Sequence, residues 1–304
     1  MDRILITGAL GQLGLEFIKY FKKSDTFVLA TDIRNPHEKL SCEFEKADVL
    51  NKERLDLLVK KYEINTIYHL VAILSANGEK NPFISWNVNM NSFQNIVEIS
   101  VDNNIKNIFW PSSIAVFGTD SNLDFVPQNP SMNPETIYGV SKLAGEKLSS
   151  YYSRKFGLDI RSLRYPGIIS TDTLPGGGTT DYIIEMLNAA KNKSDYTCFL
   201  SKETRLPMMY IDDAIDAAVK LMSIERKKLT ISSSYNISGF SITPSELEDQ
   251  IKSRGFNIKI NYKPDFRQEI ANSWPKEIDD SSSIKDWGWS CNFGLKETLD
   301  KVFS

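Results

Sequence analysis

The stretch RILITGALGQLGLEF, residues 3–17, joins a β-rich apolar run to an amphipathic, helix-like segment through a glycine-rich turn. Gly8, Gly11 and Gly14 occupy this junction with the spacing GxxGxxG. Glycine at such a junction lets backbone N–H groups approach a pyrophosphate, and the positive end of the helix dipole favours its charge. Glycines also serve ordinary strand-to-helix turns, so the turn predicts a dinucleotide site only where the rest of the chain agrees.

The segments that follow alternate short β-rich runs with amphipathic stretches. Strands are expected at 26–32, 42–48, 66–72, 107–113 and 159–167, and helices at 13–23, 51–62, 84–101 and from about Tyr138. This alternation is typical of a parallel sheet covered by helices on both faces. The sequence therefore predicts an α/β fold, a Rossmann-type doubly wound parallel sheet with at least six strands.

Beyond Gly167 the expected elements become shorter and mixed, which is typical of a smaller lobe laid over one edge of the sheet. We expect residues 1–167, with a return segment around 205–236, to form a dinucleotide-binding Rossmann domain. Residues 168–204 and 237–304 are then expected to form a smaller mixed α/β C-terminal lobe that binds the substrate.

Composition limits the partners of the chain. The 304 residues carry a net charge of −3, with Lys and Arg spread along the sequence, which argues against nucleic acid or a membrane and favours a small-molecule substrate. Cys42, Cys198 and Cys291 are isolated, which fits a reducing cytoplasm better than a disulfide framework or a zinc cage. His37 and His69 are too few for most imidazole sites, so both are interpreted as structural and no metal is expected. No window approaches about 20 apolar residues, and the first strand starts almost at once, so neither a membrane span nor a leader peptide is expected.

The end of the second expected strand indicates which dinucleotide binds. Asp32 lies where a carboxylate can accept the adenosine ribose hydroxyls and repel a 2′-phosphate, which favours NAD over NADP. Arg34 is the counter-indication, because its guanidinium could bind that phosphate, although a solvated loop arginine is an equally good reading. Asp48, after the third strand, and Leu70 and Ala72, after the fourth, are candidates for the adenine site.

Tyr138 and Lys142, in TIYGVSKLAGE, stand four residues apart, so on a helix their side chains share one face. A tyrosine with a pKa near 10 is a poor base at neutral pH, and a nearby cation favours its phenolate. A unit charge at about 4 Å contributes about 4 kcal/mol at an effective dielectric constant of about 20, so we expect Lys142 to lower the pKa of Tyr138. Ser113, at the end of NIFWPSS, is expected to hold the substrate oxygen by a hydrogen bond, and Ser112 is expected to be structural.

The chain has no GxSxG elbow, so hydride transfer is favoured over nucleophilic serine chemistry.

Several of these motifs occur together in a known family. TGALGQLG, ATDIR, PSSIAVFG and YGVSKLAGE resemble the extended short-chain dehydrogenase/reductase superfamily. LSANGEK, RSLRYPGIIS, PGGGTTDYIIEM, RLPMMYIDDAI, ITPSEL and ANSWPKEIDDS are similar to its L-threonine 3-dehydrogenase branch, nearly end to end. Two departures are visible: Val71 stands where alanine is commoner, and Ser92 and Phe93 replace a usual Gly-Thr. Neither removes a functional group.

The resemblance implies an NAD-dependent, metal-free oxidation of L-threonine at C3 to 2-amino-3-oxobutyrate, the first step of threonine catabolism. It implies a catalytic set of Tyr138, Lys142 and Ser113. It implies substrate-binding positions at Ser75, Ser113, Tyr138, Thr179, Thr180 and Asp181. The cofactor-binding positions, some of them argued from the residues above, are Gly8, Gly11, Gln12, Leu13, Gly14, Asp32, Ile33, Arg34, Asp48, Val49, Leu70, Val71, Ala72, Asn89, Tyr138, Lys142, Tyr165, Gly167 and Ile168. The family tends to form dimers through the helix that carries the Tyr and Lys pair, although the apolar stripe of this segment equally fits packing against the sheet.

The glycine-rich stretch LPGGGTTDY, residues 174–182, has two readings. By itself it is a flexible surface loop, but after RYPG it is expected beside the nicotinamide, where Thr179, Thr180 and Asp181 would face an amino acid. An aspartate suits an ammonium group, and hydroxyls suit a carboxylate.

Two alternatives for the function of the protein stay open. One is a nucleotide-sugar epimerase or dehydratase of the same superfamily, and the other is a non-catalytic NAD-binding protein.

Overall fold

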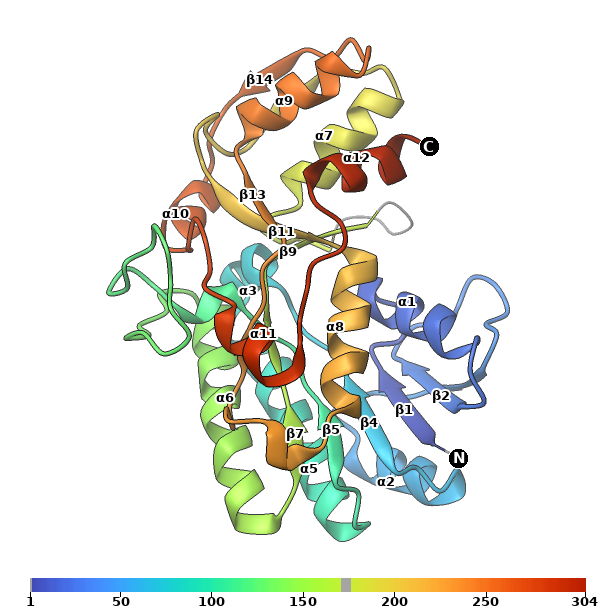
Figure 1. Cartoon of the computed structure of the whole chain (residues 1–304). Coiled ribbons are helices and arrows are strands. Elements are labelled where there is room, and N and C mark those ends of the chain that lie inside the picture. The colour runs from blue at the N-terminus through green and yellow to red at the C-terminus, as the bar shows by residue number, and fades with distance from the viewer. Residues whose placement is uncertain (1, 171–175) are drawn as a thin grey trace.

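The structure, a computed structural model, describes residues 2–170 and 176–304. Its centre is a sheet of six parallel strands in the order β3-β2-β1-β4-β5-β7 (Figure 1). The strands are β1 (Arg3–Thr7), β2 (Phe27–Asp32), β3 (Glu43–Lys46), β4 (Thr66–His69), β5 (Asn107–Phe109) and β7 (Asp159–Arg161). The doubly wound parallel sheet expected from the sequence is confirmed. Strand order reverses between β1 and β4, and ligands of such sheets bind at the carboxyl ends of the strands near this reversal.

Both faces of the sheet are covered, because alternate side chains of each strand point in opposite directions. Ile4 and Ile6 pack with α1 (Gln12–Phe21) and α8 (Ile211–Ser223), which also contact each other. Leu5, between them, packs on the opposite side with residues of α2 (Lys52–Lys61) and α5 (Ser92–Asp102). The longest helix, α6 (Ile137–Phe156), contacts β6, β7 and α5 beside this second core.

The single helix expected at 84–101 is divided in the structure. It consists of α4 (Pro82–Trp86), a π-helical turn η1 (Asn87–Asn91) and α5, and a short helix α3 (Ser75–Lys80) that was not predicted precedes it. The Asn89 side chain bonds both backbone groups of Ile73, accepting from its N–H at 2.7 Å and donating to its carbonyl at 3.1 Å. Single π turns within helices are frequent at functional sites, and this one fixes the chain that leaves β4.

The strands expected at 107–113 and 159–167 are also divided, because the chain changes sheet within each run. After β5, β6 (Ser112–Ser113) pairs with β8 (Leu163–Tyr165), which in turn pairs with β12 (Tyr235–Asn236). After β8, β9 (Gly167–Ile169) joins a third sheet, in which β11 (Leu206–Tyr210) lies between β9 and β13 (Phe240–Ile242). A continuous apolar run does not reveal such a change of partner, since each short strand is buried in the same way.

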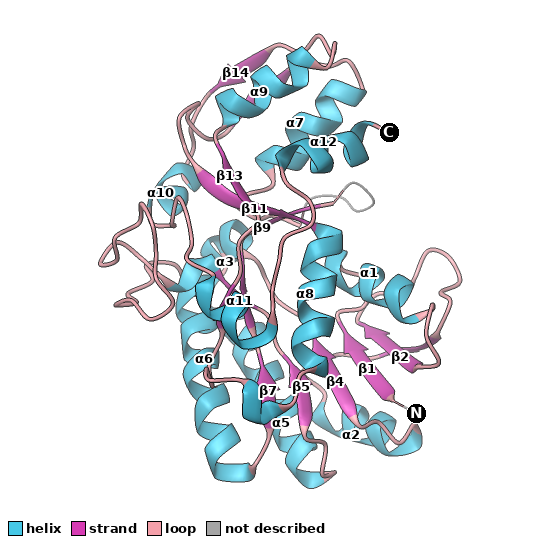
Figure 2. Cartoon of the chain, viewed as in Figure 1, coloured by secondary structure: helices cyan, strands magenta, loops and turns pink. Residues whose placement is uncertain are grey.

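The remaining elements form a smaller mixed part above the central sheet (Figure 2). They are α7 (Tyr182–Lys191), β10 (Tyr196–Cys198), α9 (Pro244–Ser253), β14 (Ile260–Tyr262), α10 (Arg267–Asn272) and α12 (Leu295–Phe303). Helix α11 (Ser281–Trp287) instead contacts β12 beside the central sheet. The chain thus crosses between the two parts repeatedly, and the domain boundaries given above stay a prediction. Two 3₁₀ turns, η2 (Ile114–Val116) and η3 (Arg226–Lys228), complete the described elements. No helix in the described ranges is long and apolar enough to cross a membrane.

Candidate active site

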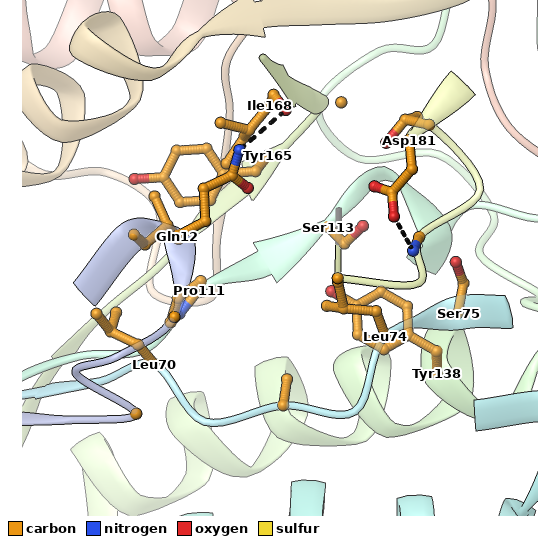
Figure 3. A pocket seen from close by; sticks show the side chains of 18 of the residues that line it. Gln12, Leu70, Leu74, Ser75, Pro111, Ser113, Tyr138, Tyr165, Ile168 and Asp181 are labelled. Atoms are coloured by element: carbon orange, nitrogen blue, oxygen red, sulfur yellow. Dashed lines mark hydrogen bonds between the residues drawn. The ribbon is translucent and has the colours of Figure 1, made fainter. Parts of the chain in front are cut away.

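A cavity of about 680 Å³ lies where the carboxyl ends of the parallel strands meet the smaller part of the molecule (Figure 3). It extends from the glycine turn after β1 to the start of α7. Its lining includes these predicted residues: Gly8, Gly11, Gln12, Leu13, Gly14, Arg34, Leu70, Ala72, Ser75, Ser113, Tyr138, Tyr165, Gly167, Ile168, Thr179, Thr180 and Asp181. Segments far apart in the sequence therefore share one space, and both predicted ends of the site open into it.

Other predicted cofactor positions do not line this cavity. They are Asp32, Ile33, Asp48, Val49, Val71, Asn89 and Lys142. Asn89 is buried, and its side chain bonds Ile73, Ser85 and Ser141. Asp48 accepts from the N–H of Leu50 at 2.9 Å, as a local turn does. Asn89 and Asp48 therefore have structural partners, and a direct contact of either with the cofactor stays a prediction.

The glycine turn has the shape that a pyrophosphate requires. Gly8 has a φ of +69°, which L side chains rarely adopt. A Cβ on Gly14 would lie 2.6 Å from the backbone of Ala9, so only glycine lets α1 pack this closely on the turn. Gly11 is the N-cap of α1, and no side chain caps it. The first N–H groups of α1 are thus left for a ligand, and the turn fits a dinucleotide.

Asp32 is held in place at the end of β2. Its carboxylate accepts from the N–H of Leu10 at 3.1 Å and from the guanidinium of Arg34 at 3.0 and 3.2 Å. Burial raises the pKa of Asp32, but the hydrogen bonds from Arg34 and Leu10 outweigh it and lower the pKa below its usual value. Arg34 is thereby paired with Asp32, so a 2′-phosphate would have to compete with the Asp32 carboxylate for the guanidinium.

Tyr138 and Lys142 lie on one face of α6, as the spacing predicts. Thr136 is the N-cap of this helix, and its hydroxyl accepts from the N–H of Gly139 at 3.0 Å. The ammonium of Lys142 lies 5.5 Å from the ring centroid of Tyr138 and 4.4 Å from that of Trp110, and it donates to the carbonyl of Pro111 at 2.6 Å. A peptide carbonyl and two aromatic faces therefore surround this buried cation.

The expectation that Lys142 lowers the pKa of Tyr138 is wrong. Burial raises the pKa of Tyr138 to about 12, and the hydroxyl of Ser113 only partly offsets this. Burial also lowers the pKa of Lys142 to about 7, with the charge of Glu146 acting in the opposite direction. Both groups are enclosed by protein, so desolvation is the largest cause of the pKa shift of each.

A buried ion pair lies behind the catalytic candidates and was not predicted. Arg164 donates to both carboxylate oxygens of Glu146, at 2.9 and 2.8 Å, and each side chain is 1% exposed. Ser112 donates to the same carboxylate at 2.6 Å. Glu146 is one turn beyond Lys142 on α6, and Ser112 precedes Ser113 on β6. The Ser112 bond ties the helix that carries Tyr138 to the strand that carries Ser113. Ser112 also lines the cavity, so its structural role stays a prediction.

The far end of the cavity is built from α3 and the start of α7. Ser75 and Thr179 hydroxyls are 3.0 Å apart, and the N–H of Thr179 donates to Ser75 at 3.2 Å. Oδ2 of Asp181 accepts from the N–H groups of Gly177 and Gly178, each at 2.8 Å. Burial raises the pKa of Asp181 despite these bonds. Residues 174 and 175 of the glycine-rich stretch lie outside the described residues.

The two histidines differ. His69 is fully buried between the hydroxyls of Thr7 and Ser92, at 2.7 and 3.0 Å, and burial lowers its pKa to about 3, so its structural interpretation is confirmed. His37 instead lines the cavity near Arg34. The sequence also missed Trp274, which lines the opposite end. Among residues 2–170 and 176–304, no group of three or more His, Cys, Asp or Glu could hold a metal ion.

Comparison with known proteins places this site in a family. Residues 4–238 match the model of the NAD dependent epimerase/dehydratase family. The chain belongs to this family. An uncharacterized epimerase/dehydratase of Staphylococcus haemolyticus is 42% identical over 301 residues, which are 97% of this chain and 94% of the relative.

Solved structures match the whole chain. A partial consensus L-threonine 3-dehydrogenase is 42% identical, with a TM-score of 0.97 over 99% of this chain and 98% of the other. The holo form of a GalE-like L-threonine dehydrogenase from Cupriavidus necator is 41% identical, with a TM-score of 0.96 and the same coverage. The chain is accordingly an NAD-dependent oxidoreductase of the epimerase/dehydratase family, and NAD is its cofactor.

Proposed function

We propose that this protein oxidises L-threonine at C3 to 2-amino-3-oxobutyrate. The observation that carries the proposal is the single cavity that contains Tyr138 and Ser113 together with Asp181. Two polar groups suited to an alcohol thus share one space with a carboxylate suited to an ammonium. The similarity to solved L-threonine dehydrogenases along the whole chain supports the same substrate.

NAD, when bound, accepts the hydride that leaves C3. We propose that the N–H groups at the start of α1 hold its pyrophosphate and that Asp32 accepts its adenosine ribose hydroxyls. Leu70 and Ala72 would border the adenine, and Tyr165, Gly167 and Ile168 the nicotinamide. Gln12 and Leu13 would border the part of the cofactor that lies between the adenine and the nicotinamide. All of these except Asp32 line the cavity.

Tyr138 is the proposed base. Its phenolate oxygen would take the proton of the threonine hydroxyl while Ser113 holds the hydroxyl oxygen by a hydrogen bond. Because burial raises the pKa of Tyr138 to about 12, the phenolate needs a compensating charge, and the ammonium of Lys142 is the nearest cation on the same helix face. The Pro111 carbonyl and the Trp110 ring keep that ammonium in place.

The amino-acid part of threonine would bind at the other end. Asp181 would pair with the ammonium group through Oδ1, since Oδ2 already accepts from Gly177 and Gly178. The hydroxyls of Ser75, Thr179 and Thr180 would donate to the carboxylate. This division of charge suits an α-amino acid and not a nucleotide sugar, whose diphosphate needs cationic partners.

The direct test is the formation of reduced cofactor from L-threonine, with NAD and NADP in parallel. We expect NAD reduction with L-threonine and much weaker reduction with NADP. Epimerisation or dehydration of a nucleotide sugar without net NADH formation would favour the epimerase alternative. Tight NAD binding with no turnover of any small hydroxy compound would favour a non-catalytic NAD-binding protein.

We also propose a homodimer that uses α4 and α6. Six large apolar side chains of these contacting helices are exposed: Phe83, Ile84, Trp86, Val140, Tyr151 and Phe156. Such a surface is unfavourable in water unless a partner covers it. Sedimentation should give a dimer for the wild type, and substituting Val140 and Tyr151 by charged residues should yield monomers. A monomeric wild type would contradict this assignment.

A further inference from the structure

Glu146 is a fully buried carboxylate that the proposed mechanism does not use. It lies on α6 and is 1% exposed. Its side chain accepts hydrogen bonds from two strands: Ser112 of β6 donates at 2.6 Å, and Arg164 of β8 donates through Nε at 2.9 Å and through Nη2 at 2.8 Å. Ser112 and Arg164 are Cα partners in the parallel pairing of these strands. One carboxylate thus joins a helix to two paired strands at a single point.

The next residue of each strand lines the cavity. Ser113 follows Ser112, Tyr165 follows Arg164, and Ser113 and Tyr165 are Cα partners as well. Both of them line the cavity (Figure 3). Successive side chains of a strand point in opposite directions. The bonds that hold Ser112 and Arg164 on Glu146 therefore also fix the direction in which Ser113 and Tyr165 point.

The helix side of this contact leads to the same site. Tyr138, Lys142 and Glu146 follow one another at intervals of four residues on α6, so their side chains share one face of the helix. The proposed base lies two turns from the anchored carboxylate, and its cation lies one turn from it. Ser113 hydrogen-bonds Tyr138, which lowers the pKa of the phenol against the effect of burial. A shift of Glu146 relative to the strands would move Tyr138 relative to Ser113.

We propose that Glu146 is a positioning residue that sets the separation of the Tyr138 and Ser113 side chains. This inference rests on the proposed function and deepens it, because it explains how the two groups that hold the alcohol keep their geometry. Glu146 does not line the cavity, so it acts through the residues that it anchors. Displacing a reacting group by about 1 Å can lower a rate about a hundredfold, so the contact affects turnover more than cofactor binding.

Two substitutions alter the contact without leaving an unpaired buried charge, which would destabilise the fold. Glu146→Asp keeps the charge opposite Arg164 but shortens the side chain by one methylene, so the carboxylate must withdraw from the strands or pull them toward α6. Ser112→Ala removes the bond to β6 and leaves the ion pair intact. Asp159→Glu is the matched control. It also changes the length by one methylene in an ion pair, with Arg161 at 2.6 Å, on β7 outside the cavity lining.

The experiment measures kcat with L-threonine per NADH-binding site, so that unfolded protein does not count as lost turnover. Glu146→Asp should lower kcat about tenfold to a hundredfold and Ser112→Ala about fivefold, while the dissociation constant of NADH stays within about twofold. Asp159→Glu should change kcat by less than about twofold, because β7 carries no residue of the site. The double variant Glu146→Asp/Ser112→Ala should be at most about twofold slower than Glu146→Asp, since both changes break the same contact.

Three results would overturn the inference. They are a kcat of Glu146→Asp within about twofold of the wild type, an equal loss in Asp159→Glu, and a double variant whose loss is the product of the single losses. The last result would mean that Ser112 acts on the substrate directly and not through Glu146.

Fluorotyrosine at position 138 gives a readout that needs no turnover. Its fluorine resonance should shift in Glu146→Asp and in Ser112→Ala but not in Asp159→Glu, and an unchanged resonance in the first two would also overturn the inference. If Glu146→Asp does not fold, the kcat and the resonance of Ser112→Ala decide the question. If the wild-type protein forms no NADH from L-threonine, the proposed function is contradicted, and the resonance still decides the role of Glu146.

Discussion

At the glycine-turn end of the cavity the polar groups are mainly backbone N–H groups from one short segment, whereas at the Asp181 end they are side chains from distant segments. The turn from Gly8 to Gly14 joins consecutive elements, β1 and α1. Ser75, Tyr138 and Asp181 meet only because α3, α6 and the start of α7 converge. Local spacing therefore specifies the cofactor end, and tertiary packing specifies the substrate end. Variants at one end should leave binding at the other end largely intact.

The largest effect is expected at Tyr138, where the two ends meet. Tyr138→Phe removes the proposed base and should lower turnover at least about a hundredfold. The affinity for the cofactor, measured as the dissociation constant of NADH by fluorescence titration, should change little, because the glycine turn is untouched. Turnover near the wild-type level would remove Tyr138 from the mechanism.

A smaller loss is expected at the substrate end. Asp181→Asn keeps an oxygen that can accept from Gly177 and Gly178 but loses the charge that would hold the ammonium, so KM for L-threonine should rise about tenfold to a hundredfold. KM for NAD should be unchanged. Glu185→Gln, one turn further on α7 and outside the cavity lining, is the control and should have little effect. Equal changes in both variants would mean that general charge, and not Asp181 itself, matters.

The cofactor end should show the opposite pattern. Asp32→Ala removes the carboxylate and frees the Arg34 guanidinium, so the preference for NAD over NADP should fall about tenfold while KM for L-threonine stays constant. Glu53→Ala serves as the comparison, because Glu53 is an exposed carboxylate on α2 outside the cavity lining, and it should leave both cofactor constants within about twofold. Equal changes in the two variants would show that general charge, and not Asp32 itself, sets the cofactor preference.

The smallest effect is expected in the pH dependence of stability. Burial lowers the pKa of Lys142 from 10.5 to about 7, so between these values the unfolded chain holds a proton that the folded chain has released. Stability should therefore rise with pH above about 7 through this group. Urea unfolding at about pH 7 and about pH 9 should reveal this rise in the wild type and a weaker one in Lys142→Met. The same slope in both proteins would show that Lys142 stays charged when folded.

Features that depend on one segment of the chain could be predicted from the sequence, and features that depend on contacts between distant segments could not. The parallel sheet and the glycine turn could be predicted, because each depends on periodicity or on spacing within one segment. The placement of Tyr138 beside Lys142 could also be predicted, since both are on one helix. The direction of their pKa shifts could not, because it depends on the burial of both side chains, which only the fold provides.

At the substrate end, the sequence indicates Asp181 and its neighbours through resemblance to a family and through their position after RYPG. Nothing in its local spacing indicates that Ser75 lies 3.0 Å from Thr179, which is 104 positions away. Trp274 was missed, since a buried tryptophan after a short helix is usually a core residue. The Glu146–Arg164 pair was missed because its two residues come from separate elements, α6 and β8, and no local spacing connects them.

The most direct test of the central claim uses L-threonine that carries deuterium at C3. Hydride transfer from C3 predicts one NADH formed for each threonine oxidised, with the deuterium on the nicotinamide, together with a slower rate than with unlabelled substrate. Mass spectrometry of the reduced cofactor measures the label. NADH without deuterium would contradict oxidation at C3, and no NADH from threonine would contradict the proposed function.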